Sequence, residues 1–240
     1  MMRFREPSEW DFDDLARFLA RGILFTKTID TMTIRVDGHD VFCITKSTAA
    51  ARPVKAPRLQ ADWGGAGAPM FQPTRVTSTP MRVEVHEAWH CVPWHNTGGR
   101  QTGKDIHTTV HCRVVEAAAT VKADKAFRSH TLRVLKKELP ATARVQLLYP
   151  GPKESATWAA ARSGDRTAAP RGVARSAAAS CGGWASHILP VDLTTGAATG
   201  LVFVGLATHQ TTGAAMHLHS QLIPTIEREN IDFQDPQLRR

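Results

Sequence analysis

The sequence has few cysteines, and they lie far apart. Four occur among the 240 residues, and no two of them form a C-x-x-C pair: Cys43, Cys91, Cys112 and Cys181. Disulfide-stapled domains and zinc knuckles both need closely grouped cysteines, so this spacing argues against either. We therefore expect a reducing, intracellular setting, either cytoplasmic or nuclear.

Aromatic residues and long apolar runs are also scarce. Aromatics make up 7% of the chain, with Tyr149 as the single tyrosine, which predicts a core of Val, Leu, Ile and Ala. No run approaches the roughly 20 apolar residues that a membrane-spanning helix needs. Residues 1–14 are polar and acidic, unlike the basic and then apolar start of a signal peptide. We expect no membrane partner.

Positive charge exceeds negative charge without forming a strong basic block. The net charge is +8 and the sequence pI is about 9.7, which would permit contact with nucleic acid, acidic lipid or phosphate. The clearest basic face belongs to a helix expected at 124–139, and we interpret its cations as solvated: Lys125, Arg128, Lys136 and Lys137. A basic nucleic-acid-binding protein is kept as an alternative function, but nucleic acid is not an expected partner.

Apolar periodicity and turn signals predict an α+β protein. Asp11 can cap an amino-terminal helix, and Asp37-Gly38 predicts a hairpin turn. Other elements are expected where apolar residues recur at strand or helix spacing: strands at 31–36, 41–45, 79–92, 106–121, 145–149 and 201–206, helices at 124–139 and 214–222, and a turn at 96–103.

Composition divides the chain into five parts. Two stretches rich in small residues, 49–77 and 151–186, bury too little apolar surface to offset the entropy of ordering. We predict an irregular insert for the first and a low-complexity linker for the second. The structured parts are then 1–48, 78–150 and 187–240, and the last of these is expected to pack with 78–150.

His86-Glu87-x-x-His90 matches the pattern of zinc-dependent hydrolases. In those enzymes a helix places both imidazoles on one face, and the glutamate activates the metal-bound water. Here residues 82–85 alternate like a strand and Pro93 follows closely, so a strand is predicted instead. Along a strand the two histidines would lie about 13 Å apart, too far to share a metal ion. We expect no metal site and keep the zinc hydrolase as an alternative function.

Two further groups contain closely spaced potential metal ligands. One is His107 with His111 and Cys112, and the other is His217 with His219. Histidines at such spacing are more often surface polar residues than ligands, and Cys112, on one strand face with Val110 and Val114, is expected to pack as a small hydrophobe. Neither group is predicted to bind metal.

Three blocks of the sequence resemble one family. Residues 12–19, with the hairpin and Thr45-Lys46-Ser47 that follow, are similar to a helix and hairpin of that family. Residues 126–151 are similar to its helix with a proline stop and a strand ending in Tyr-x-Gly. The stretch from 202 to 233 is the most specific, because it contains both Gln-Thr-Thr-Gly and Ile-Pro-Thr-Ile-Glu-Arg-Glu. The chain thereby resembles large fungal proteins with a histidine-kinase/heat-shock-protein-90-like (GHKL) ATPase domain, which are relatives of sacsin.

The resemblance implies the end of a GHKL-type α/β sandwich, followed by a mixed-sheet β-α-β middle-type domain with the two irregular inserts. It implies Mg-ATP as the cofactor of full-length members. The Asp-x-Gly-x-Gly loop and the Asn-bearing helix motif that hold Mg-ATP in such ATPases do not occur in these 240 residues. We therefore expect no cofactor in this chain alone, and a fragment that is not catalytic by itself. It would act as an interaction or chaperone-type module, with an upstream ATPase domain or another chain, and protein clients, as partners.

The resemblance also offers one candidate catalytic residue. Residues 223–231 are similar to a middle-domain loop of the heat-shock chaperones whose arginine contacts the terminal phosphate, which places Arg228 as a phosphate sensor. The alternative is that Arg228 is a surface arginine paired with Glu227 or Glu229.

The turn before this loop is the second candidate. Gln210, Thr211, Thr212 and Gly213 resemble the Gln-Thr-Lys turn of gyrase-like relatives, without its lysine, and would lie near the nucleotide. The alternative is a tight turn in which Gly213 adopts a positive φ.

Overall fold

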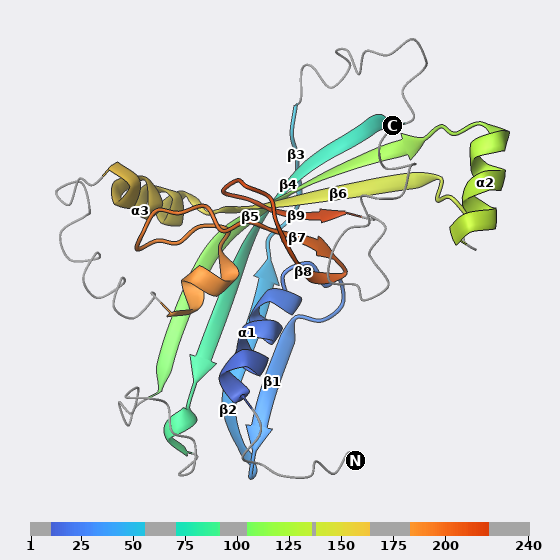
Figure 1. Ribbon diagram of the computed structural model, residues 1–240. Helices are drawn as coiled ribbons and strands as arrows, with labels where there is room; N and C mark the ends of the chain where they lie inside the picture. Colours follow the sequence, from blue (N-terminus) through green and yellow to red (C-terminus); the bar gives the residue numbers. More distant parts are fainter. Residues whose placement is uncertain (1–10, 56–70, 92–104, 136–137, 164–182, 221–240) are drawn as a thin grey trace.

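Strands dominate the fold shown in Figure 1, a computed structural model that describes residues 11–55, 71–91, 105–135, 138–163 and 183–220. A helical segment at 183–188 accompanies the main elements. In chain order these are α1 (Phe12–Gly22), β1 (Thr31–Val36), β2 (His39–Thr48), β3 (Arg52–Pro53), β4 (Phe71–Glu87), η2 (Trp89–Cys91), β5 (Ile106–Val121), α2 (Lys125–Leu135), β6 (Thr142–Pro150), α3 (Pro152–Ser163), β7 (Leu201–Val204), β8 (Leu206–Thr211) and β9 (His217–Ser220). The predicted α+β class is confirmed.

The strands of the described residues form one mixed sheet. Its order is β1-β2-β4-β5-β6-β9-β7-β8, with β3 paired to β4. Neighbouring strands are antiparallel except β7 and β9, which are parallel. The long strands β4 and β5 pair along their whole length, while β2 adds to the second half of β4 and β6 to the second half of β5. These two strands therefore join the amino-terminal hairpin to the carboxy-terminal strands (Figure 1).

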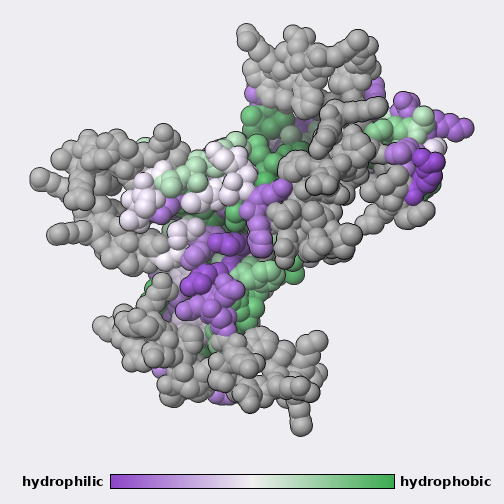
Figure 2. Space-filling view, in the orientation of Figure 1, coloured by the Kyte–Doolittle hydropathy of each residue, from purple (hydrophilic) through white to green (hydrophobic). Residues whose placement is uncertain are grey.

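Alternation along the long strands separates a buried face of the sheet from an open face. α1 and the helical segment at 183–188 pack on the buried face. The core they form with β2, β4 and β5 includes Ala16, Ala20, Ile23, Phe42, Ile44, Met81, Val83, Val85, Val110, Cys112, Trp184, Ala185 and Ile188. Figure 2 shows that hydrophilic residues gather over α1 and α2. None of the helices in the described residues is long and apolar enough to cross a membrane.

The amino-terminal helix and the first hairpin form where local sequence signals predict them. The Asp11 carboxylate accepts a hydrogen bond from the Asp14 amide at 2.8 Å and caps α1. Asp37 and Gly38 have φ of 49° and 85°, and positive φ at both central residues is typical of the two-residue turn that matches strand twist. The predicted helix and hairpin are confirmed.

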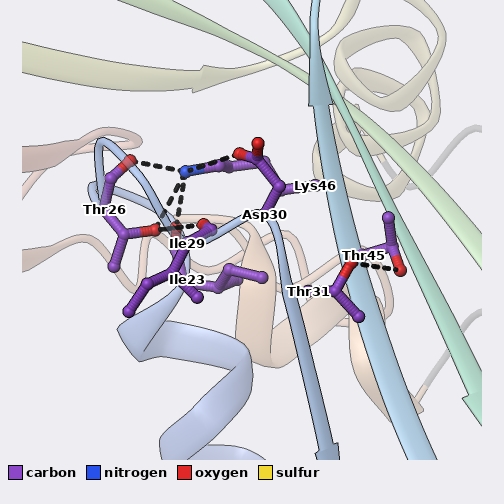
Figure 3. Close-up of polar contacts among 7 residues, drawn as sticks. All are labelled: Ile23, Thr26, Ile29, Asp30, Thr31, Thr45 and Lys46. Atoms are coloured by element: carbon purple, nitrogen blue, oxygen red, sulfur yellow. Dashed lines mark hydrogen bonds and ion pairs between the residues drawn. The ribbon is translucent and has the colours of Figure 1, made fainter.

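Lys46 fixes the end of α1 against β2 (Figure 3). Its ammonium group donates to the carbonyls of Ile23 and Thr26 at 3.1 and 2.5 Å, and to the Thr26 hydroxyl at 2.9 Å. Burial lowers the pKa of Lys46, and Asp30, 3.9 Å away, opposes this shift. The cation thus binds the carbonyl of the C-cap residue Ile23 and the segment that follows α1, and these hydrogen bonds offset the cost of burying its charge.

The predicted insert at 49–77 and the boundary after it need correction. β4 begins at Phe71, so the boundary between 77 and 78 falls inside a strand, and β3 also lies within the predicted insert. Residues 71–77 pair with 116–121 of β5. Backbone hydrogen bonds to a neighbouring strand stabilise this segment, although its own sequence has no clear alternation.

The predictions for 151–186 and 214–222 were also wrong in part. Pro152–Ser163 forms α3, in which alanine favours the helix and the Glu154 carboxylate accepts the His111 amide at 2.9 Å. His217–Ser220 forms a strand, β9, rather than part of a helix, because β6 and β7 pair with it on its two sides. Gly205, at φ 81°, divides the strand predicted at 201–206 into β7 and β8.

The other predicted elements are confirmed, with shifts at their ends. β5 matches 106–121, β6 extends 145–149 to Thr142–Pro150, and α2 is shorter than 124–139. The turn predicted at 96–103 lies outside the described residues.

Candidate functional site

The His86-Glu87-x-x-His90 motif is not helical. His86 and Glu87 end β4, and His90 lies in the short 3₁₀ helix η2. Glu87 is 5% exposed and accepts a hydrogen bond from the Trp89 indole at 3.2 Å, on the buried side of the sheet. A zinc hydrolase of this type needs its glutamate beside the metal-bound water. The strand prediction is confirmed, and Glu87 has a structural contact in place of the catalytic one.

The two histidines of the motif nevertheless approach one carboxylate on the open face. His86 Nε2 lies 3.0 Å from Asp105 Oδ2, and His90 Nε2 lies 3.5 Å from Asp105 Oδ1. The expected separation of the histidines along a continuous strand was wrong, because β4 ends at Glu87 and η2 brings His90 to the same carboxylate. The contact with His86 is also the main reason why the pKa of Asp105 lies below its usual value.

His107 completes this group from the neighbouring strand. His86 and His107 are register partners in β4 and β5, and their rings stack with centroids 4.4 Å apart and an angle of 22°. Ligand atoms of His86, Asp105 and His107 all lie within 4.8 Å of one another, and no other group in the part of the chain that the structure describes meets this condition. We refer to His86, His90, Asp105 and His107 as the histidine–aspartate cluster.

The remaining members of the first near-pair group are separated by the alternation of β5. His111 lies on the open face with His107, four residues further along the strand, whereas Cys112 is 3% exposed in the core. Burial, with a smaller contribution from Glu154, raises the pKa of the Cys112 thiol. The prediction that Cys112 packs as a small hydrophobe is confirmed.

His217 and His219 are packing residues of the buried face. His217 is 1% exposed, its Nδ1 accepts the Leu201 amide at 2.9 Å, and burial lowers its pKa to about 4. The His219 ring stacks on Phe25 with centroids 5.0 Å apart, and Phe203 contacts the His217 ring edge to face at 5.3 Å. Both rings thus belong to the aromatic packing between β7, β9 and the end of α1.

A basic pocket of 340 Å³ lies on the buried face beside the end of α1. Glu116 accepts a hydrogen bond from Gln146 at 2.8 Å and lies 4.0 Å from Arg144. Four cations and one carboxylate line the pocket, giving a net charge of 4 − 1 = +3: Lys27, Lys46, Arg75, Arg144 and Glu116. Such a lining suits a group that carries phosphate or another multiply charged anion.

The predicted nucleotide-proximal residues end β8 and form the turn after it. Gln210 and Thr211 are the last residues of the strand, and Gly213 has φ 66°, as the tight-turn alternative predicts. The Thr212 hydroxyl donates to the Met216 carbonyl at 2.8 Å, so this side chain holds its own turn together. Arg228 lies outside the described residues.

The predicted basic helix face is also used in part by the fold. The Arg128 guanidinium donates to the carbonyls of Ala123 and Val121 at 3.2 and 3.3 Å, which fastens α2 to the end of β5. Lys125 is exposed, and Lys136 and Lys137 lie outside the described residues.

Sequence reasoning missed Asp105 and Lys46. Asp105 stands directly before β5 and two residues from His107, so pairing β4 with β5 in register would have placed it beside His86. Lys46 follows Phe42 and Ile44 at strand spacing, which is the signal for a lysine on a buried face.

Comparison with known proteins gives a family for the larger part of the chain. No curated protein and no solved structure matches it. Residues 99–240, which include β5 and everything after it, match a family described as a protein of unknown function, DUF3684. This stretch covers Asp105 and His107 of the histidine–aspartate cluster, the Gln-Thr-Thr-Gly turn and Arg228. Because the match extends over more than half of the chain, the protein belongs to the DUF3684 family.

Proposed function

We propose that the chain is an intracellular interaction or chaperone-type module of sacsin-like, heat-shock-protein-90-like ATPases. In this proposal it adopts the end of a GHKL-type sandwich and a middle-type domain, and it does not hydrolyse ATP alone. It acts on the nucleotide state of an upstream ATPase domain or another chain. The proposal starts from the sequence block at 202–233 and from the lack of the Asp-x-Gly-x-Gly loop in these residues.

The basic pocket is the observation that carries this proposal. Arg75 and Arg144 reach it from β4 and β6, and Lys27 reaches it from the segment after α1. Guanidinium groups bind phosphate oxygens in a bidentate manner. The fourth cation, Lys46, already donates to backbone carbonyls, and the other three favour a triphosphate over a neutral ligand. We therefore expect the triphosphate of a nucleotide bound to a partner to contact the cations of this pocket.

The position of β9 supports the same reading of the predicted phosphate sensor. β9 ends at Ser220, which pairs with Val145, the residue after Arg144 of the pocket. Arg228 follows Ser220 by eight residues in the sequence, which motivates its inclusion in the proposal. In this proposal Arg228 and the pocket cations contact the same phosphate chain.

Two measurements test the proposal. Titration of the chain alone with a fluorescent ATP analogue is expected to show no binding at micromolar affinity, because the adenine and magnesium contacts are supplied by the partner. Added to a purified ATPase domain of a sacsin-like protein, the chain is expected to change the rate of ATP hydrolysis.

The matched variants separate the pocket from general charge effects. Arg75→Glu with Arg144→Glu should abolish the change in hydrolysis rate, whereas Lys153→Glu, an exposed charge reversal on α3 outside the pocket, should leave it intact. Micromolar ATP binding by the chain alone would contradict the non-catalytic proposal. An effect that survives the double substitution would remove the pocket from it.

A further inference from the structure

The histidine–aspartate cluster draws side chains from three separate elements to one point on the open face. His86 comes from the end of β4, His90 from η2, and His107 from the start of β5, with Asp105 directly before that strand. Strand register alone explains one contact, the His86–His107 pair. It does not explain why His90 and Asp105 also turn toward this pair. Four side chains therefore come together here, where the pairing of β4 with β5 requires only two.

The distances suit a small metal ion. Zinc holds nitrogen and oxygen ligands at about 2.0–2.2 Å in a tetrahedron, which places the ligand atoms about 3.4 Å from one another. His86 and Asp105 are 3.0 Å apart, His90 and Asp105 are 3.5 Å apart, and the His107 ligand atom lies within 4.8 Å of both His86 and Asp105. His90 is not part of the group within 4.8 Å, so its side chain would turn from Asp105 toward the ion to complete a tetrahedral shell.

The ligand types select the metal. Three imidazoles and one carboxylate suit zinc and other divalent transition metals, whereas magnesium and calcium prefer shells made of oxygen. Cys91 adds a softer donor nearby, because its thiol lies 3.6 Å from His90 Nε2. Solvent reaches the cluster, since the side chains of His86, His90 and Asp105 are 31%, 30% and 49% exposed, so an ion has a path of entry.

We propose that His86, His90, Asp105 and His107 form a binding site for a divalent transition-metal ion, with Zn²⁺ as the expected occupant. The ion would be held by four protein ligands and would tie the end of β4 and η2 to the start of β5. Closed four-ligand shells are typical of structural zinc rather than of catalytic zinc, which keeps a position for water. This role agrees with the place of Glu87, whose carboxylate contacts Trp89 on the other face.

The site is independent of the proposed interaction function. The pocket residues Thr77, Thr79 and Met81 lie on the buried face of β4, whereas His86 lies on the open face near its end. The outcome of a metal measurement therefore leaves the nucleotide proposal untouched.

Zinc titration of the full chain, first freed of metal with a chelator, tests the site. Calorimetry is expected to show one Zn²⁺ per chain, and Zn²⁺ should raise the melting temperature. Co²⁺, used as a spectroscopic probe, should give the intense absorption of tetrahedral coordination. His107→Ala and Asp105→Asn should each weaken Zn²⁺ binding at least about tenfold. Loss of a residue that merely hydrogen-bonds a metal ligand already lowers metal affinity by that factor, and loss of a ligand should lower it at least as much.

His111→Ala is the matched control. His111 lies on the same face of the same strand and is exposed, but it is not part of the cluster. This variant should keep both the Zn²⁺ affinity and the increase in melting temperature. Wild-type protein that binds no Zn²⁺, or Zn²⁺ binding that is equally strong in His107→Ala, would overturn the proposal. The far-ultraviolet circular dichroism of each variant confirms that the sheet is intact.

Discussion

Acidification should destabilise the protein through His217 before its carboxylates protonate. The ring belongs to β9 and is buried against β7 and the end of α1. Burial lowers its pKa, Arg21 lowers it further, and the backbone of Ile188 opposes this shift. Since Nδ1 accepts the Leu201 amide hydrogen, the neutral ring carries its proton on Nε2. The folded state therefore keeps His217 neutral at a pH where the unfolded chain binds a proton.

The size of the effect follows from the two pKa values. The pKa of His217 is about 4 in the folded protein against 6.5 for an unperturbed histidine. The contribution to stability is complete above the unfolded pKa, and it is lost as the pH falls from about 6.5 toward about 4. Each unit of pKa difference corresponds to about 1.4 kcal/mol, so the loss is about 3 kcal/mol.

Urea denaturation of wild-type protein and of His217→Gln between pH 7 and pH 4 measures this loss. The glutamine oxygen can still accept the Leu201 amide, but it does not titrate. The free energy of unfolding of the wild type should fall by about 3 kcal/mol more than that of the variant over this range. Carboxylates titrate in both proteins, so they cancel in the difference. Two parallel curves would refute the assignment of a neutral, buried His217.

Two further predictions concern glycines that leave no room for a side chain or have positive φ, and the buried Lys46. Gly200→Ala should destabilise the protein by about 3 kcal/mol, because a Cβ there would lie 2.1 Å from the Met216 carbonyl oxygen; Gly205→Ala, with φ 81° but open space, should cost about 1–2 kcal/mol. Thermal melting of both variants checks the order, and a larger loss in Gly205→Ala would contradict it. Lys46→Met should lower the free energy of unfolding by about 2–4 kcal/mol, because buried carbonyls at the end of α1 lose a charged donor. Lys55→Met, at an exposed position, should have little effect in the same denaturation experiment, and equal effects of the two lysine substitutions would contradict the structural role of Lys46.

The elements with strong local signals were predictable from the sequence. The Asp11 cap, the Asp37-Gly38 turn and the alternation from Ile106 to Val121 are short-range features, and the structure has each of them. The prediction failed where pairing partners decide the outcome. The alternation of polar and apolar residues at 217–220 is too short to distinguish a helix from a strand. These residues form a strand because they pair with β6 on one side and β7 on the other.

The candidate site shows the same division. The sequence singled out His86, His90 and His107, but it treated 86–90 as one continuous strand and therefore kept the histidines apart. The end of β4 at Glu87 and the η2 turn bring His90 to Asp105, a residue that no motif marks. Arg228 and its role as a phosphate sensor remain a prediction.

The sequence by itself determined the α+β class, the start of α1, the first hairpin and the long strand β5, because each depends on contacts within a few residues. Only the tertiary structure decided that the amino-terminal hairpin and the carboxy-terminal strands share one sheet, that Lys46 is buried, and that His86, Asp105 and His107 meet. The physical reason is that these outcomes depend on the register between β4 and β5 and on where β4 stops. Backbone hydrogen bonding between distant segments fixes that register, and no local pattern encodes it.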